Sequence, residues 1–146
     1  MSTAVRGERA WCVVVPHHAR GARMARHRLA TDLRELISPE LLGDTIAVVA
    51  ELVGNAVRHA DPLPGGVVRV AWRLRSEPET TVEIRVTDGG ADRPPLPRAA
   101  GPEAQDGRGL AIVAALALRW GVEKDGLGQC VWAELGSVRR AQAPVT

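Results

Sequence analysis

Two neighbouring segments carry large apolar residues at every second position with mostly polar residues between them, and this alternation constrains the fold most strongly. The segments are Val67–Arg75 and Thr80–Asp88, joined by a short loop at 76–79. The apolar positions are Val68, Val70, Trp72 and Leu74, followed by Val82, Ile84 and Val86. Successive side chains of a strand point to opposite faces, so each segment predicts an antiparallel strand with one solvated face. Such a sheet needs a second layer over its apolar face.

Two segments with helical spacing come earlier in the chain and can supply that layer. The first runs from about Ala19 to Leu36 and follows an expected strand at Ala10–Val15. The second begins at Ser38-Pro39, which suits an N-cap followed by proline at the first helical position. It continues to about Ala60, with apolar residues at helical intervals.

The carboxy-terminal half predicts one more helix and two more strands. Segment 89–106 is rich in Gly, Pro and Ala and is expected to be a loop, whereas Leu110–Leu118 is apolar enough for a helix buried on most sides. Strands are expected at Trp120–Lys124 and Gln129–Leu135, and the tail at 137–146 is expected to fray.

The element order predicts an α+β fold, a two-layer sandwich with a mainly antiparallel mixed β-sheet and helices on one face. Strict strand–helix–strand alternation is absent, which argues against a Rossmann domain. We expect one domain over residues 1–146, with its core at about 10–135.

Composition excludes several classes of function. The chain of 146 residues has no apolar run of about 18 residues and no secretory signal, so we expect a cytoplasmic protein that does not enter a membrane. Cys12 and Cys130 are far apart in the chain, which favours two reduced thiols. A net charge of +2 and the absence of Phe and Tyr argue against direct nucleic-acid binding. His17, His18 and His27 accompany an arginine-rich helix, and this pattern favours a solvated face over a metal site.

Glu51 and Asn55 are four residues apart on the second helix and therefore lie one turn apart on the same face. By spacing alone, the favoured explanation is a solvated surface pair or a local side-chain hydrogen bond. The functional alternative is that the Asn55 carbonyl oxygen binds Mg²⁺, a cation that prefers oxygen ligands. Glu51 would then be placed to take a proton from an attacking hydroxyl.

Asp88 continues the inward series of its strand, which predicts a carboxylate facing the buried side. An unpaired buried carboxylate is costly, so some group must hydrogen-bond to it. Gly89 and Gly90 follow and permit close approach to the backbone. Asp88 is either a turn-capping residue or the acceptor for an adenine amino group.

Gly107, Arg108, Gly109 and Leu110 precede the apolar helix. The first N–H groups of a helix have no partners within it, so this junction predicts an anion site to which Arg108 adds a positive charge. An ordinary loop-to-helix junction is the alternative. The pattern is neither the dinucleotide-binding glycine motif nor a Walker A loop.

The three motifs together resemble a known superfamily. ELVGNAVRHA (Glu51–Ala60), VTDGG (Val86–Gly90) and GRGLAIV (Gly107–Val113) are similar in order and spacing to the N, G1 and G2 boxes of the GHKL, or Bergerat-fold, ATPases. The short chain and GQCVWAEL (Gly128–Leu135) most resemble the anti-sigma-factor serine kinases of actinomycetes. The resemblance covers about residues 10–135.

The resemblance implies ATP between helices and sheet, with Mg²⁺ on Asn55, adenine on Asp88 and Glu51 as the base for a substrate serine. It implies phosphates framed by Gly90 and by Gly107, Arg108, Gly109 and Leu110, under a lid at 89–106. The implied partners are a sigma factor and an anti-anti-sigma protein, and a homodimer would fit the family.

The chain departs from its relatives at Asp92, where many have glycine, in its proline-rich lid, and at Cys130, where many carry a threonine that helps to bind the base. These departures favour a second hypothesis, a non-catalytic ATP-binding switch that sequesters a partner. The detached catalytic domain of a sensor histidine kinase is a third hypothesis, although the chain lacks a helical hairpin with a phospho-acceptor histidine. A structural protein that binds no nucleotide is the remaining alternative.

Overall fold

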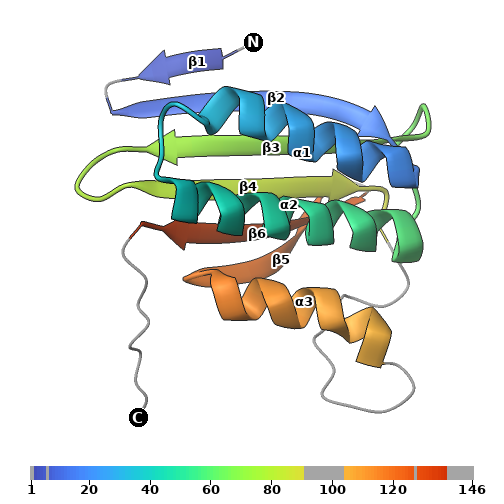
Figure 1. Ribbon diagram of the computed structural model, residues 1–146. Coiled ribbons are helices and arrows are strands. Elements are labelled where there is room, and N and C mark those ends of the chain that lie inside the picture. Colours follow the sequence, from blue (N-terminus) through green and yellow to red (C-terminus); the bar gives the residue numbers. More distant parts are fainter. Residues whose placement is uncertain (1, 6, 91–103, 127, 138–146) are drawn as a thin grey trace.

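The computed structural model describes residues 2–5, 7–90, 104–126 and 128–137, and it consists of one sheet with helices against one face (Figure 1). The strands are β1 (Ser2–Val5), β2 (Glu8–Pro16), β3 (Val67–Arg75), β4 (Thr81–Asp88), β5 (Arg119–Asp125) and β6 (Gly128–Gly136). The helices are α1 (Ala19–Leu33), α2 (Pro39–His59) and α3 (Ala104–Leu116). This arrangement confirms the predicted α+β sandwich.

The six strands form a sheet in the order β1-β2-β3-β4-β6-β5, and each neighbouring pair is antiparallel. β1 was not predicted from the sequence. Its four residues have no apolar alternation, and its strand conformation is completed by pairing with the longer β2. β3 and β4 pair as the alternation predicts, with Trp72 opposite Ile84.

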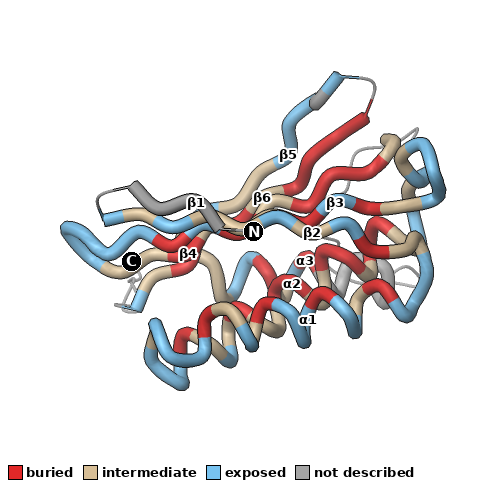
Figure 2. Tube along the Cα trace, turned by 90° about the horizontal axis from the view of Figure 1, so that it is seen from above, coloured by how far each residue is buried: buried red, intermediate tan, exposed pale blue. Residues whose placement is uncertain are grey.

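The core lies between the sheet and the helices, where Figure 2 shows the buried residues. Trp72, Ile84 and Val86 face this layer from the sheet, and Leu52 and Val53 face it from α2. The start of α2 follows the prediction, because the Ser38 side chain accepts a hydrogen bond from the Leu41 N–H at 3.1 Å and Pro39 is the first helical residue. This cap satisfies one of the N–H groups that the helix itself leaves unpaired.

The structure corrects the prediction for α3 in two respects. The helix begins at Ala104, inside the segment expected to be a loop. Its glycines at 107 and 109 each lower helix propensity by about 1 kcal/mol relative to alanine, but packing of α3 on α2 and β5 outweighs this preference. Over residues 110–116 the helix is also buried on one side only: Leu110 and Val113 face the core, whereas the alanines at 111, 114 and 115 are exposed. Alanine contributes to an apolar run without requiring burial.

Two helical glycines give a matched test of this packing. A Cβ added at Gly21 in α1 would lie 2.1 Å from the Pro16 carbonyl oxygen, whereas a Cβ at Gly43 in α2 meets nothing within 4 Å. We expect Gly21→Ala to lower the free energy of unfolding by about 1–3 kcal/mol through overpacking. Gly43→Ala should raise it by about 0.4–1 kcal/mol. Urea denaturation of both variants measures these changes, and equal effects at the two positions would contradict the described α1–β2 junction.

Candidate functional site

Asp88 is a buried carboxylate at the end of β4. It lies on the helix-facing row with Ile84 and Val86 and is only 2% exposed. Its Oδ1 accepts a hydrogen bond from the Gly90 N–H at 2.7 Å. A carboxylate has about four acceptor positions on two oxygens, so this contact leaves acceptor capacity for another donor. Asp88 therefore caps a turn, as one interpretation of the sequence expected, and can still accept a hydrogen bond from a ligand.

Glycines allow the backbone to pack closely around this carboxylate. Gly90 has φ +99°, a conformation that side-chain-bearing residues rarely adopt, and this conformation directs its N–H to Asp88. The backbone of Gly128 on β6 lies so close to Asp88 that an added Cβ would be 2.0 Å from the Asp88 carbonyl oxygen. Larger residues at either position would move Asp88.

Backbone hydrogen bonds join the end of β4 to the segment that follows α2. The Gly89 N–H donates to the Asp61 carbonyl oxygen at 2.7 Å, and the Asp61 N–H donates to the Gly90 carbonyl oxygen at 2.9 Å. Asp61 comes two residues after the last residue of α2. Figure 1 accordingly shows the carboxy-terminal ends of α2 and β4 at the same end of the molecule. The N and G1 motifs thus meet there.

Asn55 on α2 carries a buried amide that is only partly satisfied. The residue is 8% exposed, and its Oδ1 accepts a hydrogen bond from Arg58 Nη2 at 3.1 Å. Its Nδ2 is buried and has no hydrogen-bond partner among the described residues. An unsatisfied buried polar group costs about 1–3 kcal/mol, and a ligand near this amide would relieve that cost. Glu51, one turn earlier, is half-buried.

The burial of Asp88 has an electrostatic consequence. Removal from water disfavours the charged form and raises the pKa of Asp88 above its ordinary value of 3.8. The Gly90 N–H and the nearby His17 ring oppose this rise in pKa, whereas the Asp61 carboxylate adds to it. The structure thus keeps a carboxylate at a position where its ionised form is unfavourable without a partner.

The predicted phosphate segment lies in α3 rather than before it. Gly107, Arg108 and Gly109 have helical backbone, so the prediction of a glycine turn at the helix start was wrong. Because the unpaired N–H groups of a helix belong to its first four residues, they lie at 104–107 here. The Leu110 side chain is 3% exposed and packs in the core, so only its backbone could approach a ligand. Figure 1 shows the start of α3 at the same end of the molecule as the end of β4, and Asp88 is the last residue of β4.

Two residues near Asp88, Gln129 and His17, were not identified from the sequence as part of this site. Gln129 on β6 pairs with Asp88 and is 5% exposed on the same helix-facing row. Cys130 pairs with Thr87 and therefore faces away from the helices, so it does not occupy the base-binding position that the resemblance implied. Val131, Ala133 and Leu135 alternate along β6 on its helix-facing side, and Gln129 is the next position of that row. This alternation could have identified Gln129 from the sequence.

His17 is the second of these residues. The solvated face expected for the amino-terminal histidines does not include it, because it is partly buried and its ring contacts the end of α2. His18 is exposed, and its Nδ1 accepts a hydrogen bond from the Arg20 N–H at 3.0 Å, which caps α1. Two adjacent histidines thus have different roles, which composition alone could not distinguish.

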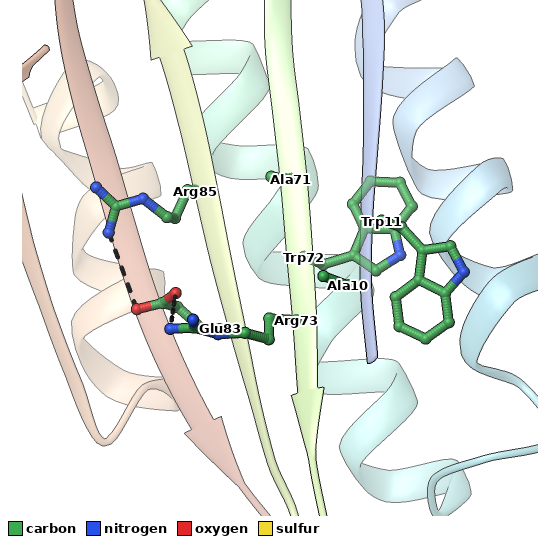
Figure 3. Close-up of a pocket in the computed structure, with 7 residues that line it drawn as sticks. All are labelled: Ala10, Trp11, Ala71, Trp72, Arg73, Glu83 and Arg85. Carbon is green, nitrogen blue, oxygen red and sulfur yellow. Dashed lines mark hydrogen bonds and ion pairs between the residues drawn. The ribbon is translucent and has the colours of Figure 1, made fainter. Parts of the chain in front are cut away.

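A surface hollow on the sheet, shown in Figure 3, lies away from these residues. Its charged side chains already pair with one another: Glu83 contacts Arg73 at 2.9 Å and Arg85 at 3.9 Å. The other lining residues are Ala10, Trp11, Ala71 and Trp72. None of the predicted site residues lines this hollow, so it is not the predicted nucleotide site.

Each helix in the described part of the chain is too short or too polar to span a lipid bilayer. The described residues contain no group of three or more His, Cys, Asp or Glu side chains arranged to hold a metal ion. Cys12 and Cys130, the two cysteines of the chain, are not joined to each other by a disulfide bond.

The fold and site together define a two-layer α+β domain with a buried polar site at one end of the interface between helix and sheet. A family model described as the histidine kinase-like ATPase domain matches residues 15–135. The chain therefore belongs to the histidine kinase-like ATPase domain family, which confirms the predicted superfamily. A search of curated proteins finds no match to the chain.

The raised pKa of Asp88 predicts a trade-off between stability and ligand binding. A carboxyl group whose pKa is higher in the folded protein binds its proton more tightly there, so the free energy of unfolding falls as pH rises from about 3.8 through the raised pKa. Asp88→Asn removes this titration. We expect the variant to be more stable than the wild type at pH 7 and equally stable below the ordinary pKa.

Urea denaturation between about pH 3 and pH 8 measures this difference. Glu79→Gln, which neutralises an exposed carboxylate, is the control and should leave the pH profile nearly unchanged. An Asp88→Asn variant that is less stable than the wild type at pH 7 would show that the protein already stabilises the ionised carboxylate.

Proposed function

We propose that the protein is an ATP-binding regulatory switch, namely an anti-sigma factor with serine/threonine protein kinase activity toward an anti-anti-sigma partner. The observation that carries the proposal is the buried Asp88 carboxylate, which retains acceptor capacity at the junction of β4 with the end of α2. Family membership supports ATP as the ligand. The sigma factor and the anti-anti-sigma protein come from the sequence resemblance.

The residues at the site fit a nucleotide. The 6-amino group of adenine is a hydrogen-bond donor, and donation to Asp88 would compensate for the burial of that carboxylate. Gln129, beside Asp88 on the same sheet face, offers an amide for a second polar contact. A guanine base presents a carbonyl oxygen at the equivalent position, and two acceptors would repel one another. The site is therefore selective for adenine over guanine.

The same site fits Mg²⁺ at Asn55. Its Oδ1 is an oxygen ligand of the kind that Mg²⁺ prefers, and the Arg58 side chain that now donates to Oδ1 belongs to an exposed residue. Bound Mg²⁺ would neutralise charge on the phosphates, which is its usual contribution to phosphoryl transfer. Arg58 must leave Oδ1 when the ion binds, because guanidinium and Mg²⁺ repel one another.

Glu51 is the proposed base. Its half-buried carboxylate lies one helical turn from Asn55 on the same side of α2, within the region where the phosphates are proposed to bind. A carboxylate there can accept the proton of a substrate serine hydroxyl as that oxygen bonds to the γ-phosphorus of ATP and the bond from that phosphorus to the leaving ADP breaks. The backbone of Gly90 and the first turns of α3 are proposed to approach the phosphates.

One structural observation favours the alternative, a switch that binds ATP and a partner without phosphoryl transfer. The predicted metal-binding oxygen of Asn55 is already engaged by Arg58. If Arg58 retains this contact when nucleotide is present, the phosphates lack their metal ion. Nucleotide-dependent partner binding without turnover would then be the function.

A phosphoryl-transfer assay separates these two functions. The protein is incubated with radiolabelled ATP, Mg²⁺ and an anti-anti-sigma protein, and labelled partner is quantified. We expect transfer in the wild type and a decrease of roughly 10²–10⁴-fold in Glu51→Gln, the range for loss of a general base. ATP affinity should change little, because Glu51 is not proposed to contact the base.

Glu40→Gln is the matched control, since Glu40 is an exposed carboxylate in the first turn of the same helix. It should transfer phosphate at the wild-type rate. Unchanged transfer in Glu51→Gln would exclude Glu51 as the base. Absence of transfer in the wild type, together with nucleotide-dependent partner binding, would select the non-catalytic switch.

A further inference from the structure

We infer that His17 is a positioning residue that holds the end of α2 against the end of β4 and thereby sets the place of Asp88 in the adenine site. This inference rests on the proposed nucleotide site, and it assigns a role to a residue outside the three motifs. His17 is the residue that follows β2, far from both elements in the sequence.

The contacts of the His17 ring identify it as a donor to the end of α2. Its Nε2 lies 3.0 Å from the Ala56 carbonyl oxygen and 2.8 Å from the Ala60 carbonyl oxygen. Carbonyl oxygens only accept hydrogen bonds, so Nε2 carries a proton shared between them. The Ala56 carbonyl oxygen also accepts from the Ala60 N–H at 3.1 Å, whereas the Ala60 carbonyl group lies at the helix end, where no helical N–H follows, and His17 supplies a donor to it.

The His17 backbone adds a second anchor. Its N–H donates to the Gly66 carbonyl oxygen at 2.9 Å, in the turn that leads into β3. The residue therefore connects the end of β2, the end of α2 and the start of β3. Loss of the ring would release the end of α2 and leave the backbone contact in place.

Hydrogen bonds continue from the end of α2 to Asp88. Ala60 is followed by Asp61, whose backbone exchanges two hydrogen bonds with Gly89 and Gly90. The Gly90 N–H in turn donates to Asp88 Oδ1. A shift of the α2 end would thus be transmitted through Asp61 and Gly90 to the carboxylate. Ala56, which accepts from His17, also directly follows Asn55, so the same ring restrains the proposed metal ligand.

The ring also lies near enough to Asp88 to lower the pKa of that carboxyl group, which favours its ionised form. An ionised Asp88 is the better acceptor for an adenine amino group. The mechanical and electrostatic effects of His17 therefore act in the same direction, toward adenine binding.

The test uses two amide substitutions that differ in reach. The amide nitrogen of glutamine extends one bond further than that of asparagine, and it can approach the position of His17 Nε2, whereas asparagine falls short. Fluorescence or calorimetric titration with ATP and GTP gives the ATP/GTP affinity ratio. A loss of general stability would not change this ratio at temperatures where the variant is folded.

We expect His17→Asn to lower the ATP/GTP affinity ratio about tenfold, and His17→Gln to retain it within about twofold. In an Asp88→Asn background the His17→Asn change should have little further effect on the ratio, because the two residues act through one path. His18→Asn is the control, since His18 is exposed and caps α1 only. Circular dichroism establishes that each variant is folded.

An unchanged ratio in His17→Asn, or equal losses in His17→Asn and His17→Gln, would overturn the positioning role while leaving the proposed function intact. Failure of the wild type to bind ATP would overturn the proposed function and, with it, this inference.

Discussion

The site depends on one costly arrangement, a carboxylate buried at the boundary between sheet and helices. Asp88 occupies the last inward position of a strand whose preceding inward residues are Ile84 and Val86. An apolar residue there would extend the core by one layer. A carboxylate instead carries a desolvation cost that only hydrogen-bond donors can offset. Among the residues that the structure describes, the Gly90 N–H is one such donor, and acceptor capacity remains for a ligand.

Much of the remaining architecture keeps that carboxylate in position. The glycines at 90 and 128 allow backbone to approach it, the Asp61 backbone ties the end of α2 to it, and His17 joins that helix end to β2. Asn55, whose Nδ2 has no hydrogen-bond partner within the described parts of the chain, lies near the same helix end. Two buried polar groups with spare hydrogen-bonding capacity, on opposite layers of the sandwich, are more consistent with a ligand site than with a core that is complete without one.

The sequence predicted the parts of this structure that have a simple period. The alternation predicted β3, β4 and their pairing, and helical spacing with the Ser38 cap predicted α2. Asp88 and Asn55 were therefore assigned to the correct elements. It did not predict β1, which depends on pairing with β2, or the start of α3, where packing overrides the low helix propensity of two glycines. Local patterns carry no information about such tertiary contacts.

The same limit applies within the site. His17 could not be identified as a site residue because its partners are backbone carbonyl groups 39 and 43 residues away, at 56 and 60. Gln129 could have been found by extending the alternation of β6. The resemblance implied a base-binding role for Cys130, but this residue faces away from the helices. Arg58 lies within a predicted motif, but its contact with Asn55 depends on a side-chain conformation that spacing cannot specify.

The central claim is that Asp88 binds the base of ATP, and isothermal titration calorimetry tests it most directly. Asp88→Ala should abolish measurable ATP binding. Arg75→Ala, which removes an exposed ion pair with Glu8 at the far end of the β3–β4 pair, should bind ATP as the wild type does. Wild-type affinity for ATP in a folded Asp88→Ala variant would contradict the account.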